Sequence, residues 1–475
     1  MRSIGEKCAV FGIYGKGLDV SRLAFFGLYA LQHRGQESSG IASTDGEKIF
    51  CYKNNGLVSS VFGEEEITSL KGHAAIGHNR YSTSSGGDLK HAQPIEVSDG
   101  SIVLVHNGNL PTTSQLTDFL KKKGIETSDY SDSKLITEAI FCLTREGVEL
   151  EQAVEKVFPM MTGAFSILIM NKNKLIAIRD QHGIRPLSIA KLNGGWVFAS
   201  ETCAFHPIGA KHISDVHPGE MVVVDETGLH RKQIVKSIQK LDIFEFVYFS
   251  RPDSQLLGKS VYEVRKNFGI ELAREYKIDA DVVIPVPETA IPVAVGYAAA
   301  SGIPYEMGII KSRYIHRTFI EPEQHIREQG VKLKLAPLKG IIKGKRVVVV
   351  DDSIVRGTTS RQIVKMLFEA GAREVHFLVS SPPVKFPDFY GIDLPKQGEL
   401  IAANRSIAEI NKYLGSTSLN YISFKGMINA TGLKESIFST SCFNGKYPID
   451  IKQRRKEVTY PIIDSNDRKG PSFLN

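Results

Sequence analysis

The chain has 475 residues, of which 42% are hydrophobic and 23% are charged, and its formal net charge is +7. At about 150 residues per domain, this length predicts roughly two to three domains, and the composition excludes wholesale disorder. No apolar run approaches the ~18–20 residues that span a bilayer, and the mild positive charge suits an anionic substrate at least as well as nucleic acid.

The leading segment and the cysteines indicate a cytoplasmic protein. Residues 1–7 contain no apolar stretch of the kind found in signal peptides, so we expect no secretion. The five cysteines lie far apart and form no Cys-x-x-Cys pair, which disfavours a disulfide framework or a zinc site. A reducing, cytoplasmic location is therefore the expectation.

The first half of the chain predicts strands separated by polar turns, with helices between them. Helical spacing predicts helices around 23–32 and 135–144. Apolar runs predict strands at 9–14, 102–105, 164–170, 174–179 and 196–200, and we expect the second of these to end in a turn at 106–109. Helices and strands without strict alternation favour an α+β layered domain.

The second half changes to an alternating pattern of strands and helices. Strands are predicted at 282–286, 347–350 and 375–379. Helices are predicted at 291–300 and around 363–370, where the helical spacing ends at Gly371. Strand, helix, strand in this order predicts a parallel sheet with right-handed crossovers. We place the boundary between the halves near residues 235–255.

Polar strings beside apolar elements mark a candidate site in the first half. Cys8 opens the first strand, and alone it is more typical of a small buried hydrophobe than of a nucleophile. The later strings are Gln32-His33-Arg34-Gly35-Gln36, His78-Asn79-Arg80-Tyr81-Ser82-Thr83, His106-Asn107-Gly108-Asn109 and Ser131-Asp132. Together they resemble the N-terminal-nucleophile glutamine amidotransferases, which implies an α+β layered sandwich.

The resemblance implies a role for each of five residues. Cys8 would attack the glutamine side-chain amide, and the Asn107 amide and Gly108 backbone N–H would form the oxyanion hole. Arg80 would bind the glutamine α-carboxylate with a guanidinium suited to bidentate contact, and Asp132 would bind the α-ammonium group.

The family's cysteine lies at the N-terminus of the mature chain. A free α-amine, with a pKa near ~8, can act as the base for the thiol. We therefore expect residues 1–7 to be a propeptide that is removed autocatalytically.

The string around Asp132 departs from the family pattern at one charged position. Where the family commonly has Ser-Asp-Thr-Glu, this chain has Ser131-Asp132-Ser133-Lys134, so the aspartate is kept and a lysine replaces the glutamate.

The string from Val347 to Ser360 marks the candidate site in the second half. Four valines predict a buried strand, and Asp351 and Asp352 follow at its carboxyl end, where ligands bind in α/β sheets. The glycine and hydroxyl residues that lead into the next helix suit a phosphate. Two carboxylates beside them suit ribose hydroxyls and a hydrated Mg²⁺.

This string resembles the phosphoribosylpyrophosphate loop of type I phosphoribosyltransferases. The resemblance implies that Asp351 and Asp352 face the ribose and one Mg²⁺ per subunit, with Thr289 near the metal and Lys311 near the pyrophosphate. The ribose 5-phosphate would lie on the turn formed by Arg356, Gly357, Thr358, Thr359 and Ser360. The aperiodic stretch 314–335 would be a hood over the pyrophosphate, with possible cations at Arg327, Lys332 and Lys334.

The two halves together resemble the glutamine phosphoribosylpyrophosphate amidotransferases. We expect a propeptide (1–7), a glutaminase domain (8–240), an α/β phosphoribosyltransferase domain with a parallel sheet (241–450) and a tail (451–475). The implied enzyme is a glycosyltransferase that makes 5-phosphoribosylamine, glutamate and pyrophosphate at the first committed step of purine biosynthesis. Internal passage of ammonia, a homotetramer, and inhibition by purine nucleotides are implied too, with neither nucleic acid nor membrane as partner.

Some members of that family hold a structural [4Fe–4S] cluster on four cysteines. By local matching, the corresponding positions here are Asp242, Asp388, Ser436 and Ser439. Without cysteines at these positions a cluster of that kind cannot form, so we expect the cluster-free branch.

Two other classes share part of these patterns. Asparagine synthetase, glutamate synthase and glucosamine-phosphate synthase would share the glutaminase half, but the string at 347–360 argues against all three. Purine-sensing transcriptional regulators retain a phosphoribosyl loop without transferase activity. No helix-turn-helix with a basic face is evident in this sequence, and Cys8 with the polar strings quoted above favours catalysis.

Overall fold

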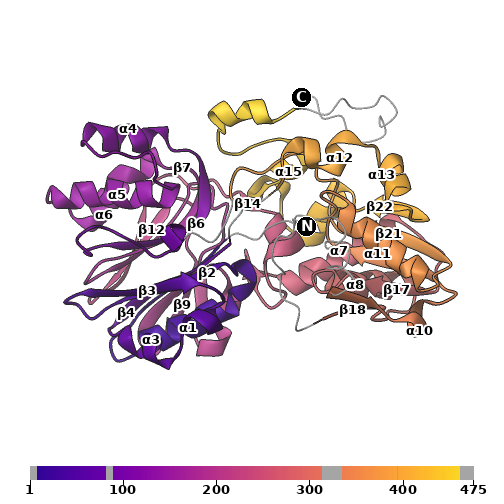
Figure 1. Cartoon of the computed structure of the whole chain (residues 1–475), viewed down its shortest axis with the longest axis horizontal. Coiled ribbons are helices and arrows are strands. Elements are labelled where there is room, and N and C mark those ends of the chain that lie inside the picture. The colour runs from indigo at the N-terminus through magenta and orange to yellow at the C-terminus, as the bar shows by residue number, and fades with distance from the viewer. Residues whose placement is uncertain (1–7, 82–88, 313–333, 393, 460–475) are drawn as a thin grey trace.

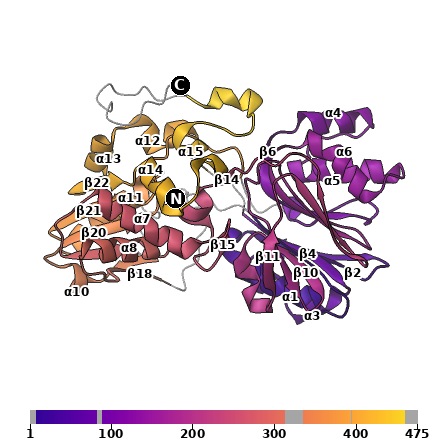
Figure 2. The ribbon, with the colours of Figure 1, turned by 180° about the vertical axis from the view of Figure 1, so that it is seen from behind.

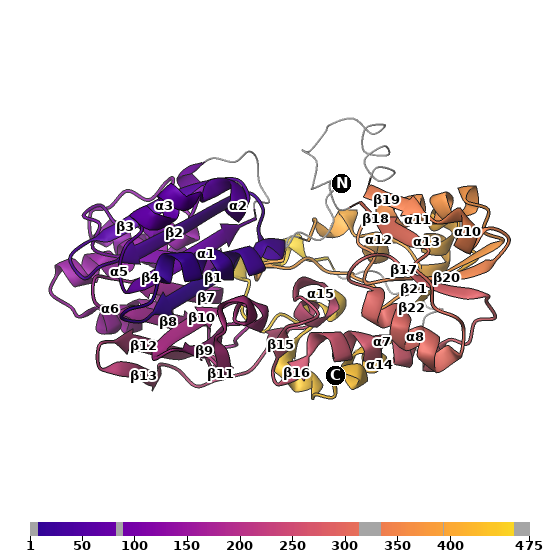
Figure 3. The same cartoon turned by 90° about the horizontal axis from the view of Figure 1, so that it is seen from below.

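The computed structural model describes residues 8–81, 89–312, 334–392 and 394–459. The expected propeptide and most of the expected hood therefore lie outside the described residues. Figure 1 shows the N-terminal half, in indigo to magenta, beside the C-terminal half, in orange to yellow, and Figure 3 shows the two halves side by side from below. Within the described ranges, no helix combines the length and apolar character needed to cross a membrane.

Two antiparallel sheets form the centre of the N-terminal half. The first has the strand order β11-β9-β10-β1-β4-β2-β3, and the second has the order β13-β12-β8-β7-β6-β5. The strands are β1 Ala9–Tyr14, β2 Ser38–Thr44, β3 Ile49–Asn55, β4 Ala74–Arg80, β5 Ile95–Glu96, β6 Val103–Thr112, β7 Thr162–Met170, β8 Leu175–Arg179, β9 Ser188–Leu192, β10 Gly195–Ala199, β11 Lys211–Asp215, β12 Glu220–Asp225 and β13 Gly228–Gln233.

Helices cover the outer faces of both sheets, which makes four layers (Figure 1). The helices are α1 Val20–Ala30, α2 Val58–Val61, α3 Glu64–Ser69, α4 Ser114–Lys122, α5 Asp132–Arg145 and α6 Leu150–Val157. Apolar side chains fill the space under each helical layer and the space between the sheets, where Val10 and Leu168 are fully buried. This arrangement confirms the α+β layered sandwich.

The C-terminal half is built on a parallel sheet of order β17-β20-β21-β22. The strands of this half are β14 Leu241–Asp242, β15 Gln255–Leu256, β16 Lys259–Ser260, β17 Val282–Pro285, β18 Ile309–Lys311, β19 Leu335–Pro337, β20 Arg346–Asp351, β21 Glu374–Val379, β22 Ser418–Tyr421 and β23 Phe438–Ser439. The helices are α7 Val261–Glu275, α8 Ile291–Ser301, α10 Lys339–Ile342, α11 Thr358–Glu369, α12 Ile401–Asn404, α13 Ile407–Leu414, α14 Phe424–Thr431 and α15 Ser441–Asn444.

Local chemistry explains why these elements form where they do. The four β-branched valines of β20 are fully buried, as a parallel strand covered on both faces requires. The Ser260 hydroxyl caps α7 by accepting a hydrogen bond from the Glu263 N–H (3.3 Å), and α8 ends at Gly302 with a positive φ of 78°.

One predicted turn is wrong. Residues 106–109 do not turn but continue β6, which pairs with β7 from Val103 to Thr112. The polar residues stay extended because β7 supplies backbone partners on one side, a long-range effect that local composition does not reveal.

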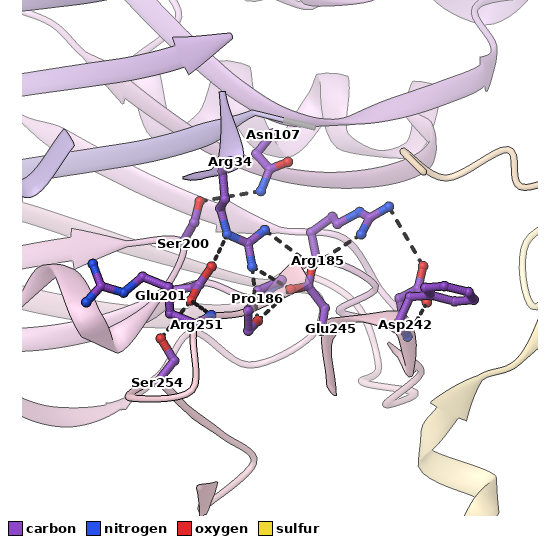
Figure 4. A network of polar contacts seen from close by, with 12 residues as sticks. Arg34, Asn107, Arg185, Pro186, Ser200, Glu201, Asp242, Glu245, Arg251 and Ser254 are labelled. Atoms are coloured by element: carbon purple, nitrogen blue, oxygen red, sulfur yellow. Dashed lines mark hydrogen bonds and ion pairs between the residues drawn. The ribbon is translucent and has the colours of Figure 1, made fainter. Parts of the chain in front are cut away.

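A buried network of charges joins the two halves (Figure 4). The Arg34 guanidinium bonds to Glu201 of the N-terminal half and to Glu245 of the C-terminal half, and its Nη2 also donates to Ser250 Oγ (3.1 Å). Arg185 reaches the same Glu245 carboxylate through its Nη1 (3.2 Å). Burial opposes the charge on Arg34, but the two carboxylates outweigh it and raise the pKa of Arg34.

Other contacts extend this junction. Glu201 accepts hydrogen bonds from the Arg251 N–H (2.9 Å) and the Ser254 hydroxyl (2.7 Å). The Gln255 N–H donates to Thr202 Oγ1 (2.8 Å), and Figure 2 shows β15 at the boundary between the halves. Buried Ile449 and Ile451, near the end of the described chain, pack with apolar residues of both halves.

We expect Arg34→Met to destabilise the protein strongly. The substitution leaves Glu201 and Glu245 buried without their cation, and breaking a buried pair from one side costs about 3–5 kcal/mol in free energy of unfolding. Urea denaturation measures the change. Arg22→Met is the control, because Arg22 pairs with Glu64 on the surface and its loss should have little effect. Equal effects of the two variants would contradict a stabilising role for the junction.

A second buried cluster lies beside Arg185. The Asp242 carboxylate is 3.7 Å from Arg185 Nη2, and Asp242 pairs with Ser439 through β14 and β23. Burial raises the pKa of Asp242 to about 8, with Arg185 opposing the shift and Asp388 adding to it. Burial, with Asp242 and Asp388, also raises the pKa of Cys442 well above its usual range. The structure thus brings Asp242, Asp388 and Ser439, three of the four matched positions, to one place.

The raised pKa of Asp242 makes stability depend on pH. Protonated Asp242 favours the folded state at pH values below its folded pKa, and this contribution is lost as the pH rises from the ordinary value of 3.8 through about 8. We therefore expect the melting temperature to fall between pH 6 and pH 9, and Asp242→Asn to flatten this dependence. Thermal melts across that range test it; parallel curves for the two proteins would refute the assignment.

Candidate functional site

Cys8 lies at the start of the central strand of the first sheet. It immediately precedes β1, is half-buried, and has a positive φ of 49°. β1 is held between β4 and β10, with Ala9 opposite Asn79 and Val10 opposite His78. The register therefore places the end of β4, where Arg80 lies, beside the cysteine.

Asn107 and Gly108 lie on β6 of the facing sheet. Asn107 is fully buried, and its Nδ2 donates to Ser200 Oγ (3.4 Å), which also accepts from the Val10 N–H (2.9 Å). A Cβ atom at Gly108 would lie 2.0 Å from the Ala164 carbonyl oxygen, so the pairing of β6 with β7 leaves room only for glycine. The amide of Asn107 is thus linked to β1, the strand that follows Cys8.

Arg80 and Asp132 approach the same region from two other elements. Arg80 ends β4, and its Nη1 is 3.7 Å from Glu37 Oε1, a separation too long for a hydrogen bond. Asp132 begins α5, which Ser131 caps, and its Oδ2 accepts from the Leu110 N–H (3.3 Å) just beyond the Asn107–Gly108 pair.

The departure at Lys134 is accommodated outside the candidate site. Its Nζ forms an ion pair with Glu138 Oε1 (2.6 Å), one turn along α5, and donates to the Glu96 carbonyl (3.1 Å). The lysine charge is therefore satisfied by its neighbours and does not compete for Asp132.

Asp351 and Asp352 lie at the carboxyl end of β20, as predicted. The Asp352 N–H donates to Asp351 Oδ1 (2.9 Å), and the Ser353 hydroxyl donates to Asp352 Oδ1 (2.6 Å). Burial and the charge of Asp352 raise the pKa of Asp351 well above its usual range, and burial raises the pKa of Asp352 to about 6. Two carboxylates held together in this way favour a cation between them.

The turn after these carboxylates leads into α11. Gly357 has a φ of +76°, in the left-handed region that favours glycine, and a Cβ atom there would lie 2.8 Å from Ile401 Cδ1. Glycine has no side chain to cap the helix, and an anion bound here would meet the first-turn N–H groups. Thr358 is exposed, Thr359 is half-buried and Ser360 is buried.

Arg356 differs from the other residues of the turn. Its Nε and Nη2 both donate to Glu399 Oε2 (3.0 and 2.8 Å). The Arg356 guanidinium is thus engaged by a carboxylate of the short 3-10 helix Gln397–Glu399.

Thr289 and Lys311 lie near the same end of the sheet. β17 pairs with β20, and the loop after it carries Glu288 and half-buried Thr289. Lys311 is the last residue of β18, and its Nζ is 3.8 Å from Glu288 Oε2. The hydrogen-bonded pairing of β18 with β19 extends the strand by this residue.

The residues present fit a hydrated Mg²⁺ that arrives with a phosphorylated substrate. In the described ranges, no three His, Cys, Asp or Glu side chains form a group that could enclose a metal. Mg²⁺ needs no such cage, because it commonly binds one or two carboxylates plus substrate phosphates and water. Asp351 and Asp352 would provide these carboxylates, and Thr289 would provide a hydroxyl at the same end of the sheet.

Sequence reasoning missed two residues that shape the first site, Gln93 and Ser200. Gln93 accepts from the His106 N–H (2.7 Å) and donates to Ser133 Oγ (3.2 Å), and Ser200 holds Asn107. His106 Nδ1 lies 3.1 Å from Ser133 Oγ. No local pattern marks Gln93 or Ser200, and only the position of Ser200 at a strand end could have drawn attention to it.

These two sites define a class of protein. A layered antiparallel fold that begins at a cysteine, joined to a parallel sheet with an acidic strand end and a glycine turn, is that of a glutamine amidotransferase coupled to a phosphoribosyltransferase. The family described as "Glutamine amidotransferase domain" matches residues 78–207, and the family described as "Phosphoribosyl transferase domain" matches residues 257–381.

Full-length relatives narrow this class to one family. The chain is 47% identical to amidophosphoribosyltransferase of Synechococcus elongatus, over 95% of this chain and 93% of the relative. It is 44% identical to the Bacillus subtilis amidophosphoribosyltransferase, over 95% and 96% of the two chains. The chain belongs to the amidophosphoribosyltransferase family.

Solved structures agree with this assignment. A structure described as the allosteric regulatory enzyme of purine biosynthesis matches with a TM-score of 0.88 and 43% identity, covering 96% of this chain and 98% of that chain. The Bacillus subtilis glutamine phosphoribosylpyrophosphate amidotransferase, complexed with ADP and GMP, matches with a TM-score of 0.87 and 42% identity, covering 96% and 100%. They confirm the predicted fold class in both halves.

Proposed function

We propose that this protein converts phosphoribosylpyrophosphate, glutamine and water into 5-phosphoribosylamine, glutamate and pyrophosphate, the first committed step of purine biosynthesis. One observation carries the proposal. A single chain of this family has Cys8 beside β1 in one half and the turn from Asp351 to Ser360 in the other, and buried charges join the two halves. The boundary near residue 240 and the tail after residue 450 remain part of this proposal.

The N-terminal site suits thioester chemistry. The Cys8 thiol attacks the glutamine side-chain carbonyl and passes its proton, through the freed α-amine, to the departing nitrogen as ammonia is released. The Asn107 amide and the Gly108 N–H stabilise the oxyanion. Arg80 binds the α-carboxylate, which its loose contact with Glu37 permits, and Asp132 binds the α-ammonium group. Water then hydrolyses the thioester to glutamate.

The C-terminal site suits displacement of pyrophosphate from the ribose. Asp351, Asp352 and Thr289 would hold Mg²⁺, which when bound neutralises charge on the departing pyrophosphate. The turn from Arg356 to Ser360 would bind the 5-phosphate through its backbone, and Lys311 would approach the pyrophosphate. Ammonia attacks C1 of the ribose as the C–O bond to pyrophosphate breaks.

The two sites require protected transfer of ammonia. At neutral pH free ammonia is mostly protonated and is then no nucleophile, so an enclosed path between the halves keeps it reactive. The junction of buried charges supports such a path, because it holds the halves against each other. Purine nucleotides are proposed as inhibitors, since the Bacillus subtilis relative was solved with ADP and GMP, and a cytoplasmic homotetramer is the proposed assembly.

The proposal includes removal of residues 1–7. If Cys8 supplies its own base, the purified active protein should have an intact mass that lacks this segment, and N-terminal sequencing should begin at Cys8. An active preparation that retains Met1 to Lys7 on every chain would contradict the role of the α-amine.

Two substitutions separate the half-reactions. Cys8→Ala should reduce glutamine-dependent pyrophosphate release at least about a thousandfold and leave synthesis from added ammonia near the wild-type rate, because only the first site is lost. Asp352→Asn should abolish both activities. Steady-state assays of pyrophosphate release with each nitrogen source measure this difference.

Cys142→Ala is the matched control, since Cys142 lies half-buried on α5 and should not affect either activity. Loss of ammonia-dependent synthesis in Cys8→Ala would show that the division of labour between the halves is wrong. Full activity in Asp352→Asn would show that Asp352 is not needed at the second site.

A further inference from the structure

Ser200 occupies a position between the nucleophile strand and the oxyanion-hole amide. It follows β10 and is fully buried. Its Oγ accepts from the Val10 N–H (2.9 Å) and from Asn107 Nδ2 (3.4 Å), and its own N–H donates to the Val10 carbonyl (3.0 Å). The two lone pairs of the hydroxyl are thus used on two elements of the first site.

Ser200 Oγ is the one hydrogen-bond partner of the Asn107 side-chain amide among the described residues. The Asn107 Oδ1 is buried and has no hydrogen-bond partner within the described ranges. The contact with Ser200 therefore sets the rotation of the amide, and one of the two Nδ2 hydrogens remains to point at an oxyanion. Figure 4 shows Asn107 and Ser200 facing each other beside Arg34.

The next residue, Glu201, anchors Ser200 from the opposite side. Glu201 has extended backbone angles (φ −139°, ψ 150°), so the consecutive side chains point in opposite directions. Its carboxylate bonds to Arg34 and accepts from the Arg251 N–H and the Ser254 hydroxyl of the C-terminal half. Burial opposes this charge, but Arg34 and His33 outweigh it and lower the pKa of Glu201.

We propose that Ser200 is a positioning residue for the glutaminase reaction. Its hydroxyl holds the Asn107 amide in a fixed position relative to β1, the strand that follows Cys8. The neighbouring Glu201 bonds to residues 251–254 of the C-terminal half and so links this position to that half. The inference rests on the proposed function and assigns to Ser200 no contact with substrate. It predicts that the second half influences glutamine hydrolysis through the placement of one amide.

Kinetics of Ser200→Ala test the proposal. We expect kcat for glutamine hydrolysis to fall about tenfold or more, a fraction of the 10²–10³-fold that loss of an oxyanion-hole donor costs. KM for glutamine and the ammonia-dependent activity should stay within about twofold, since glutamine binding and the second site are untouched. Ser200→Thr, which keeps the hydroxyl, should restore kcat.

Two further measurements separate positioning from a general structural role. Alkylation of Cys8 by iodoacetamide needs no oxyanion hole, so its rate should be unchanged in Ser200→Ala. In an Asn107→Ala background, Ser200→Ala should cause no further loss, because the residue acts through that amide. Ser188→Ala is the matched control: Ser188 is an equally buried serine on neighbouring β9, bonded to Asp215, and its loss should leave kcat unchanged.

Several outcomes would overturn the inference. Wild-type kcat in Ser200→Ala, additive losses with Asn107→Ala, or a parallel loss of alkylation and ammonia-dependent activity would each exclude positioning of the amide. Should Ser200→Ala not fold, Ser200→Cys, which keeps the volume and weakens the acceptor, is measured in its place. A wild-type protein without glutamine-dependent pyrophosphate release would instead refute the proposed function.

Discussion

The charges buried around Arg34 are the constraint on which the rest of the molecule depends. Arg34 and Arg185 lie with Glu201 and Glu245 where the two halves meet, and each of these side chains is almost completely removed from water. A buried charge is tolerated only beside its partner, so neither half can shift without exposing or orphaning a member of the set. The halves are therefore held in one relative placement, which the proposed transfer of ammonia between them requires.

The same network extends toward both candidate sites. On one side, Ser200 immediately precedes Glu201, and the Ser200 hydroxyl accepts a hydrogen bond from the Asn107 amide. On the other side, the Ser250 carbonyl accepts from Arg265 Nη2 (2.7 Å), and the charge of Arg265 acts on Asp352. Residues linked to the junction therefore lie within hydrogen-bond range of Asn107 on one side and within electrostatic range of Asp352 on the other.

Much of the fold and part of the site followed from local patterns. The valine run of β20, the acids at its end and the glycine turn all occupy the places that the sequence predicted. The prediction of a turn at 106–109 failed because the pairing of β6 with β7 outweighs local composition. For Arg356, the likeness to a phosphate loop did not reveal Glu399, a partner 43 residues away that takes up its guanidinium.

By itself the sequence determined many of the helices and strands, the two families and the residue types at each site, because these depend on neighbours along the chain and on short motifs. The tertiary structure alone decided which charges are buried together and which hydroxyl holds the Asn107 amide. Arg34 lies 167 residues from Glu201 and 211 from Glu245, and Ser200 lies 93 from Asn107. Contacts at such separations arise only when the sheets pack and the halves meet, so no local preference of the backbone encodes them.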